Sequence, residues 1–185
     1  PPVIRALLDL GEFRIDGFIC PGHVSAVTGS RVWEFIAREY KIPCVVVGFE
    51  PLDILQAIAM LTGQIEKGEP LVEIAYKRGV QPEGNAKARE IMFRIFEPAP
   101  AVWRGIGNVP GSGLKIKEDY GEFDIERFID FSTSESIVEP AGCMCGEVLR
   151  GIKTPDDCPL FGGRCTPRSP VGPCMVSSEG TCSAY

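Results

Sequence analysis

Residues 43–62 read PCVVVGFEPLDILQAIAMLT, and this stretch decides the fold class. The continuous apolar run at 43–48 predicts a strand that is buried on both faces, as the strands of parallel sheets are. Proline at position 51 then predicts the first turn of a helix that continues to residue 62. A buried strand followed directly by an apolar helix is the repeating unit of α/β proteins.

The same alternation extends in both directions from this unit. The apolar spacing predicts helices at residues 3–10, 32–40 and 83–96, and further strands at 14–20 and 71–76. The fold class is therefore α/β, with a mostly parallel sheet that is flanked by helices. Beyond residue 98 the periodicity fades, because residues 101–114 are rich in glycine and proline, and residues 123–131 predict one short helix.

The composition is that of a globular protein, with 44% hydrophobic and 24% charged residues among 185. This length suits one domain with a small appendage. The formal net charge is −6, whereas nucleic-acid-binding domains present basic surfaces, so we expect no nucleic-acid partner. No apolar run approaches the ~18 residues of a membrane-spanning helix, so we expect no membrane partner either.

The eight cysteines are unevenly placed, since two lie in the first quarter of the chain and six lie at positions 143–182. About 140 residues could fold without the six, which divides the chain into an α/β domain at 1–140 and a Cys-rich irregular segment at 141–185. That segment is rich in glycine and proline and can bury little apolar surface. It therefore needs a metal centre or disulfides to hold it together.

The spacing of these six cysteines matches no common metal template. It lacks the two short C-x2-4-C pairs of structural zinc sites and the C-x2-C-x2-C run of bacterial ferredoxins. Soft thiolates favour iron–sulfur clusters or zinc over hard cations. Spacing alone leaves an iron–sulfur cluster, zinc and disulfides open. Four ligands and one redox pair would account for all six thiols.

The residues around the cysteines resemble the C-terminal signature of the HypD family of [NiFe]-hydrogenase maturation factors. The likeness runs through residues 143–151 (CMCGEVLRG), 155–167 and 170–182, with further family-like stretches at 21–25 (PGHVS), 48–55 (GFEPLDIL), 83–86 and 103–107. It covers the whole chain but about half of the family's length. We therefore expect a C-terminal fragment that lacks the N-terminal half, in which family members are thought to hold the nascent Fe(CN)2CO unit.

The resemblance implies a [4Fe-4S] cluster in an environment like that of ferredoxin:thioredoxin reductase, with redox-active thiols beside it. A cluster passes one electron at a time, whereas a disulfide takes two, and an adjacent dithiol couples the two processes. On this basis Cys145 and Cys174 are assigned as the redox pair. Four cysteines are assigned as cluster and metal ligands: Cys143, Cys158, Cys165 and Cys182.

The resemblance also implies a role and partners. The role is a cytoplasmic, redox-active scaffold for assembly and transfer of the Fe(CN)2CO unit, rather than a classical turnover enzyme. The partners are a small HypC-type chaperone, a HypE-type cyanide donor and the N-terminal half of the same protein. Two alternatives stay open: a stand-alone, cluster-linked thiol–disulfide reductase, and a structural iron–sulfur or zinc domain that supports an interaction module.

Two further candidate site residues follow predicted strands. His23, the only histidine, comes after the strand at 14–20, and Glu50 comes after the apolar run at 43–48. The carboxyl ends of parallel strands share one edge of the sheet, so we expect both at the same edge. His23 suits proton transfer or metal ligation, or else holds a turn. Glu50 is a base or ligand, or else a carboxylate stabilised by the dipole of the following helix.

Overall fold

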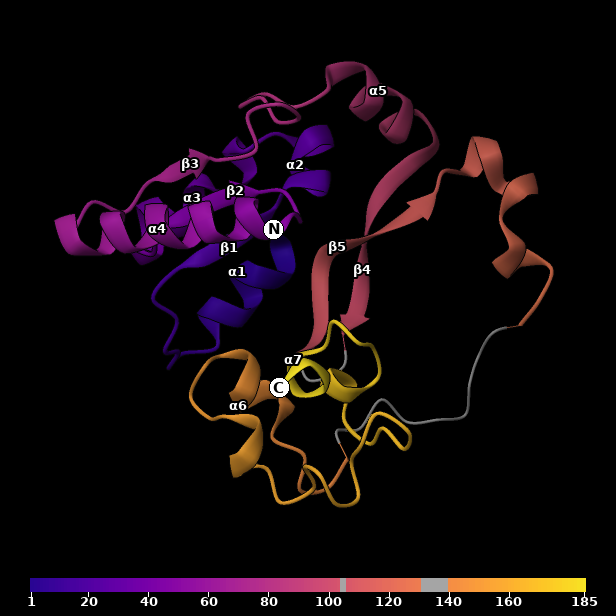
Figure 1. The fold of residues 1–185 in the computed structure, drawn as a ribbon. Coiled ribbons are helices and arrows are strands. Elements are labelled where there is room, and N and C mark those ends of the chain that lie inside the picture. Colours follow the sequence, from indigo (N-terminus) through magenta and orange to yellow (C-terminus); the bar gives the residue numbers. More distant parts are fainter. Residues whose placement is uncertain (104–105, 131–139) are drawn as a thin grey trace. The chain divides into compact units, whose positions relative to one another are not determined.

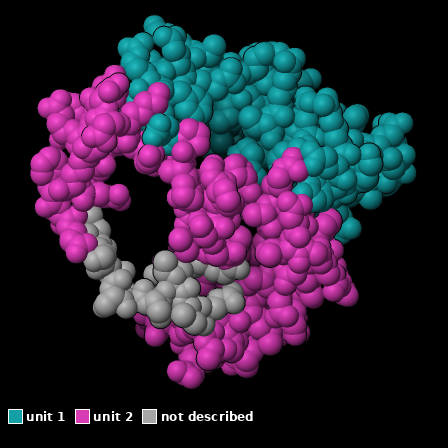
Figure 2. Space-filling model, turned by 180° about the vertical axis from the view of Figure 1, so that it is seen from behind, with its two compact units in different colours: residues 1, 15–97 teal, residues 2–14, 98–185 magenta. Residues whose placement is uncertain are grey.

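The computed structural model describes residues 1–103, 106–130 and 140–185, and it divides them into two compact units. Unit 1 comprises residue 1 and residues 15–97, and unit 2 comprises residues 2–14 and 98–185 (Figure 2). The predicted division of the chain at residue 140 stays a prediction. None of the helices in the described ranges is long and apolar enough to cross a membrane.

Unit 1 alternates strands and helices, as the sequence predicts (Figure 1). A 3₁₀ turn at Arg31–Trp33 precedes its second helix. In chain order the elements are β1 (Phe18–Pro21), α2 (Gly22–Thr28), α3 (Glu34–Tyr40), β2 (Cys44–Val47), α4 (Pro51–Lys67), β3 (Val72–Ile74) and α5 (Ala86–Ile95).

The three strands form one sheet in the order β1-β2-β3, and both pairs are parallel. Pro21 is opposite Val47, and Val46 is opposite Ile74. All four residues of the central strand β2 are buried, which is why its sequence is uninterrupted apolar. The predicted α/β class with a parallel sheet flanked by helices is therefore confirmed.

Helix α4 packs on this sheet, and residues at its two ends determine where it begins and stops. Ala57 and Leu61 of α4 contact Val45 and Val47 of β2 in a shared core cluster. The helix begins at Pro51, whose fixed φ suits the first turn. It continues five residues beyond the predicted end and stops at Gly68, which adopts a left-handed φ of 67° and donates its N–H to the last helical turn.

Unit 2 is built from shorter elements (Figure 1). Helix α1 packs against β5, and β4 and β5 form a two-stranded sheet. 3₁₀ turns occupy Glu118–Phe123, Ile125–Arg127, Pro155–Asp157 and Pro173–Met175. The longer elements are α1 (Pro2–Asp9), β4 (Phe96–Trp103), β5 (Gly107–Ile116), α6 (Cys145–Leu149) and α7 (Thr181–Ala184).

Two sequence-based expectations for the middle of the chain differ from the structure. Residues 101–114 lie largely in strands despite their glycine and proline content, because both strands of a two-stranded sheet have a free edge that tolerates proline. The helix predicted at 123–131 is absent from the described residues 123–130. Asp124 accepts a hydrogen bond from the Glu126 N–H (3.1 Å) and caps a 3₁₀ turn at Ile125–Arg127, which takes the place of the predicted helix.

Candidate metal centre

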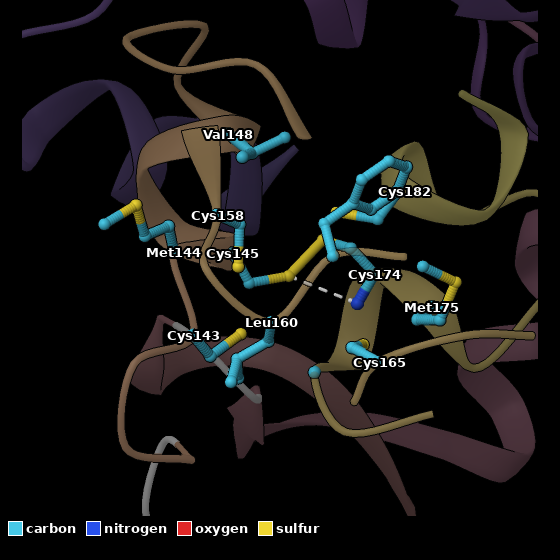
Figure 3. Close-up of a pocket in the computed structure, with 12 residues that line it drawn as sticks. Cys143, Met144, Cys145, Val148, Cys158, Leu160, Cys165, Cys174, Met175 and Cys182 are labelled. Carbon is cyan, nitrogen blue, oxygen red and sulfur yellow. Dashed lines mark hydrogen bonds between the residues drawn. A yellow bond between two sulfur atoms is a disulfide. The ribbon is translucent and has the colours of Figure 1, made fainter. Parts of the chain in front are cut away.

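All six cysteines of the C-terminal segment line one pocket in unit 2 (Figure 3). Cys145 begins α6, Cys174 lies in the 3₁₀ turn at Pro173–Met175, and Cys182 lies in α7. The other three, Cys143, Cys158 and Cys165, come from the connecting loops. Residues spread over 40 positions of sequence therefore converge on one place, which spacing alone could not show.

Short turns place the loop cysteines. Gly142 adopts φ 86°, a conformation open mainly to glycine, and so turns the chain just before Cys143. Thr154 and Asp157 form a capping box around the turn that Pro155 begins. The Cys158 N–H then donates to the Pro155 carbonyl (3.0 Å), which directs Cys158 towards the pocket. Local backbone chemistry, rather than a long regular element, positions these thiols.

Cys145 and Cys174 are joined by a disulfide bond, with Cα atoms 6.1 Å apart and a sequence separation of 29. Both residues are buried. The Cys174 backbone N–H also donates a hydrogen bond to the Cys145 Sγ at 3.1 Å (Figure 3). The structure thus brings together the two cysteines assigned as the redox pair, and their redox activity stays a prediction.

The four cysteines assigned as ligands form no disulfide, and they line the same pocket as the Cys145–Cys174 bond. Burial raises the pKa of the Cys182 thiol, and three neighbouring thiols raise it further. The Val171 N–H donates to the Cys165 Sγ at 3.3 Å. These four thiols pack with an apolar wall that includes Leu160 and Met175. The neighbours that act on Cys182 are Cys158, Cys143 and Cys165, which completes the predicted ligand set.

Four thiols could bind either a single zinc ion or a four-iron cluster. Among the described residues, no group of three or more His, Cys, Asp or Glu side chains has the arrangement of a metal-ion site. A single zinc needs four sulfurs at ~2.3 Å, and hence within about 4 Å of one another. In a four-iron cluster each thiolate binds a separate iron, so the sulfurs stand wider apart around a larger body. Four soft thiols around a largely apolar pocket fit such a cluster in donor chemistry.

The size of the pocket limits this fit. The cavity between the cysteine side chains has a volume of only about 10 Å³. The thiols would therefore have to move apart around a cluster. Metal binding and local folding are coupled in such segments, so this rearrangement would be part of binding.

His23 and Glu50 lie at one edge of the sheet in unit 1, as predicted. They follow the parallel strands β1 and β2, and the rings of His23 and Phe49 stack with centroids 4.7 Å apart. Glu50 precedes α4 as its N-cap residue, and its carboxylate lies 3.4 Å from the Arg78 guanidinium. Their catalytic or ligand roles stay predictions.

An ion pair at this edge of the sheet is not evident from the sequence. Arg78 donates two hydrogen bonds to Asp53, at 3.0 and 2.7 Å, and stacks over the Tyr76 ring. The hydrogen bonds from Arg78 hold the pKa of the buried Asp53 carboxyl below its ordinary value. A Cβ at Gly48 would collide with the same carboxylate, which explains glycine there. Asp53 and Arg78 are 25 residues apart, and only the strand topology brings them together.

The remaining two cysteines are core residues. Cys20 in β1 and Cys44 in β2 are buried. A hydrogen bond between the two thiols, together with burial, strongly raises the pKa of Cys20. Such a thiol stays neutral and unreactive. Both lie in unit 1, so they form no part of the pocket lined by the other six.

Comparison with known proteins identifies the family. A family model named HypD, described as "Hydrogenase formation hypA family", matches residues 1–185, which is the whole chain. The chain belongs to the HypD family. Nine curated proteins match it significantly.

Three curated relatives show the extent of the likeness. Hydrogenase maturation factor HypD1 of Bradyrhizobium diazoefficiens is 48% identical over 185 residues, covering 100% of this chain and 48% of that protein. A hydrogenase expression/formation protein of Methanocaldococcus jannaschii is 47% identical, covering 100% and 51%. Hydrogenase maturation factor HypD of Cupriavidus necator is 46% identical over 178 residues, covering 96% and 47%. The chain spans about half the length of the curated relatives that it matches.

Proposed function

We propose that this HypD chain holds a [4Fe-4S] cluster beside a redox-active disulfide, as part of a protein that matures [NiFe]-hydrogenases. The observation that carries the proposal is the pocket in unit 2, which six cysteines line. Two of them, Cys145 and Cys174, are joined by a disulfide and the other four form none, which supports the division that the resemblance implies. The four that would hold the cluster are Cys143, Cys158, Cys165 and Cys182.

The chemistry of the pair follows from its burial. A bound cluster would supply electrons one at a time. Reduction of the Cys145–Cys174 disulfide breaks the S–S bond, consumes two electrons and two protons, and yields two thiols. Both residues are buried, so an external thiol has poor access to either sulfur. A one-electron donor within the pocket would supply the electrons instead.

The backbone of the pair favours one sulfur as the site of negative charge. The Cys174 N–H donates to the Cys145 Sγ at 3.1 Å, and this hydrogen bond stabilises a thiolate at Cys145 once the disulfide opens. The first electron would leave a thiolate at Cys145 and a thiyl radical at Cys174. The second electron, with one proton, would convert that radical to a thiol, and a second proton at Cys145 would complete the reduction.

The wider role rests on the family. The family model spans the whole chain, and the matching proteins carry names such as hydrogenase maturation factor HypD. We place this chain in assembly and transfer of the Fe(CN)2CO unit, together with the other half of the relatives' length, a HypC-type chaperone and a HypE-type cyanide donor. At the edge of unit 1, His23 would move a proton or bind metal, and Arg78 would hold the Glu50 carboxylate in place.

The test is a Cys174→Ser substitution in the host's own gene. Serine nearly preserves the volume of the side chain, so the fold and the bound iron should persist while [NiFe]-hydrogenase maturation fails. Ser178→Ala, at an exposed position four residues away, is the matched control and should leave maturation intact. Normal maturation with Cys174→Ser would refute a redox role of this disulfide in hydrogenase maturation. Loss of general disulfide reduction, with maturation unaffected, would instead favour the stand-alone reductase, which the buried disulfide beside four thiols also suits.

A further inference from the structure

A short part of unit 2 carries most of the charge of the chain. Residues 118–130 read EDYGEFDIERFID and hold six carboxylates and one arginine, a formal charge of −5 out of the −6 of the whole chain. We call this stretch the acidic–apolar segment. Such concentration of charge in 13 residues marks a surface that attracts cations and repels anions.

The same segment exposes its large apolar side chains. Four of them lie within seven residues, and each is between 49% and 71% exposed: Phe123, Ile125, Phe128 and Ile129. Single exposed apolar residues are common on protein surfaces, but four exposed large apolar side chains within seven residues indicate an interaction site. The aromatic pair supplies the anchors that dominate the energetics of interfaces.

The segment is ordered by its own arginine. Arg127 donates two hydrogen bonds to the Glu118 carboxylate, at 2.9 and 2.5 Å, and its Nε lies 3.9 Å from Asp124. Gly121 is buried beneath the Arg127 guanidinium, where a Cβ would collide. Arg127 thereby links the 3₁₀ turn at Ile125–Arg127 to the one at Glu118–Phe123. The apolar side chains are therefore exposed on an ordered segment.

This arrangement leaves several carboxylates without a cation. Arg127 pairs with Glu118 and with Asp124. Asp119, Glu122 and Glu126 have no cationic partner among the described residues. An apolar group bordered by unpaired carboxylates is complementary to an apolar groove bordered by lysine and arginine.

We propose that the acidic–apolar segment docks a separate basic protein through such a groove. A second copy of the chain would bring the same −5 charge to the contact and be repelled. Anionic membranes and nucleic acids are excluded for the same reason. Phe123 and Phe128 provide the buried contacts, and the carboxylates steer association and set the orientation.

The test uses a defined probe with the full chain. The probe is a fluorescent 20-residue amphipathic helix with leucine on one face and lysine along its flanks, and its dissociation constant is measured by anisotropy. The wild-type chain should bind it, and the affinity should fall as salt rises. The double variant Phe123→Ser/Phe128→Ser should weaken binding at least tenfold. The matched control is Leu114→Ser/Val176→Ser, at exposed apolar positions elsewhere in unit 2, and should bind as wild type does.

Several outcomes would overturn the proposal. These are no binding of the lysine probe, equal losses in the test and control variants, and equal binding of a probe with glutamate in place of lysine. A dimer of the wild-type chain that the double variant abolishes would make the occupant a second copy. Circular dichroism and thermal unfolding of both variants establish that exposed substitutions have left the fold intact. Glu122→Gln/Glu126→Gln should keep binding but reduce its salt dependence.

Discussion

Replacing Gly172 with alanine should weaken iron binding at the proposed cluster site and leave the fold in place. A Cβ at this position would lie 2.5 Å from the Cys143 Sγ. Ordinary contacts between heavy atoms are about 3.5–4.0 Å, so the sulfur must retreat by roughly 1 Å or more. Gly172 has φ −89° and ψ 153°, which alanine adopts without strain. The substitution should therefore displace the Cys143 side chain without straining the backbone at residue 172.

The substitution should change the unfolding free energy only slightly but lower the iron affinity strongly. Rotation of one cysteine side chain relieves the clash, so the loss in unfolding free energy should be about 1 kcal/mol. A metal–sulfur distance tolerates only about ±0.2 Å, so a displacement near 1 Å removes Cys143 as a ligand. Even changes outside the ligand shell lower metal affinity by about 10–100-fold. We therefore expect iron affinity to fall at least tenfold.

The assay is iron and sulfide content, with absorbance near 400 nm, after anaerobic reconstitution of each variant. Gly163→Ala is the matched control, because the nearest atom to its Cβ would be the Leu160 carbonyl oxygen at 4.0 Å. Gly163→Ala should load as the wild type does. If Gly172→Ala retains its full complement of iron, Cys143 is not a ligand in the proposed geometry.

Three further predictions concern the disulfide and unit 1. Cys145→Ser should retain iron but lower the unfolding free energy of the oxidised protein by about 3–4 kcal/mol, since the disulfide closes a 29-residue loop. An equal urea midpoint for the variant and the wild type under oxidising conditions would contradict this prediction. Because Arg78 lowers the pKa of Asp53 below its ordinary 3.8, the stabilisation is complete above that pH and is lost as pH falls through the lower folded value. Asp53→Asn should therefore destabilise unit 1 at neutral pH and flatten its acid dependence in urea unfolding, and an unchanged acid profile would count against the pair. Asn85→Ala should lower the unfolding free energy by about 1 kcal/mol, because the Asn85 side chain caps α5 by accepting a hydrogen bond from the Ala88 N–H at 3.0 Å. Asn85→Gly should lower it by only a few tenths of a kcal/mol. Equal losses in the two variants would argue against capping.

The fold of unit 1 was predictable because its signals are local. A fully apolar run such as 44–47 predicts a strand that is buried on both faces. The alternation of strands with helices predicts that the strands are parallel. The strands β4 and β5 gave no such signal. Glycine and proline lower strand propensity, and pairing between two exposed strands, which no single stretch encodes, overrides it.

The site was predictable only in part. The six cysteines stand out in the sequence, but their spacing left zinc, an iron–sulfur cluster and disulfides open, since six thiols allow many pairings. The proximity of Cys145 and Cys174 depends on turns such as that at Gly142, whose effect on distant segments is not local. The Asp53–Arg78 pair was missed for the same reason, because each residue alone resembles an ordinary surface charge.

The most direct test of the central proposal is anaerobic analysis of metal and sulfide in the purified wild-type chain, with its electronic spectrum. Four thiol ligands correspond to one four-iron cluster, so we expect about four irons and four acid-labile sulfides per chain and a brown colour that bleaches on reduction. A chain purified without oxygen that contains zinc and no iron would contradict the proposed cluster.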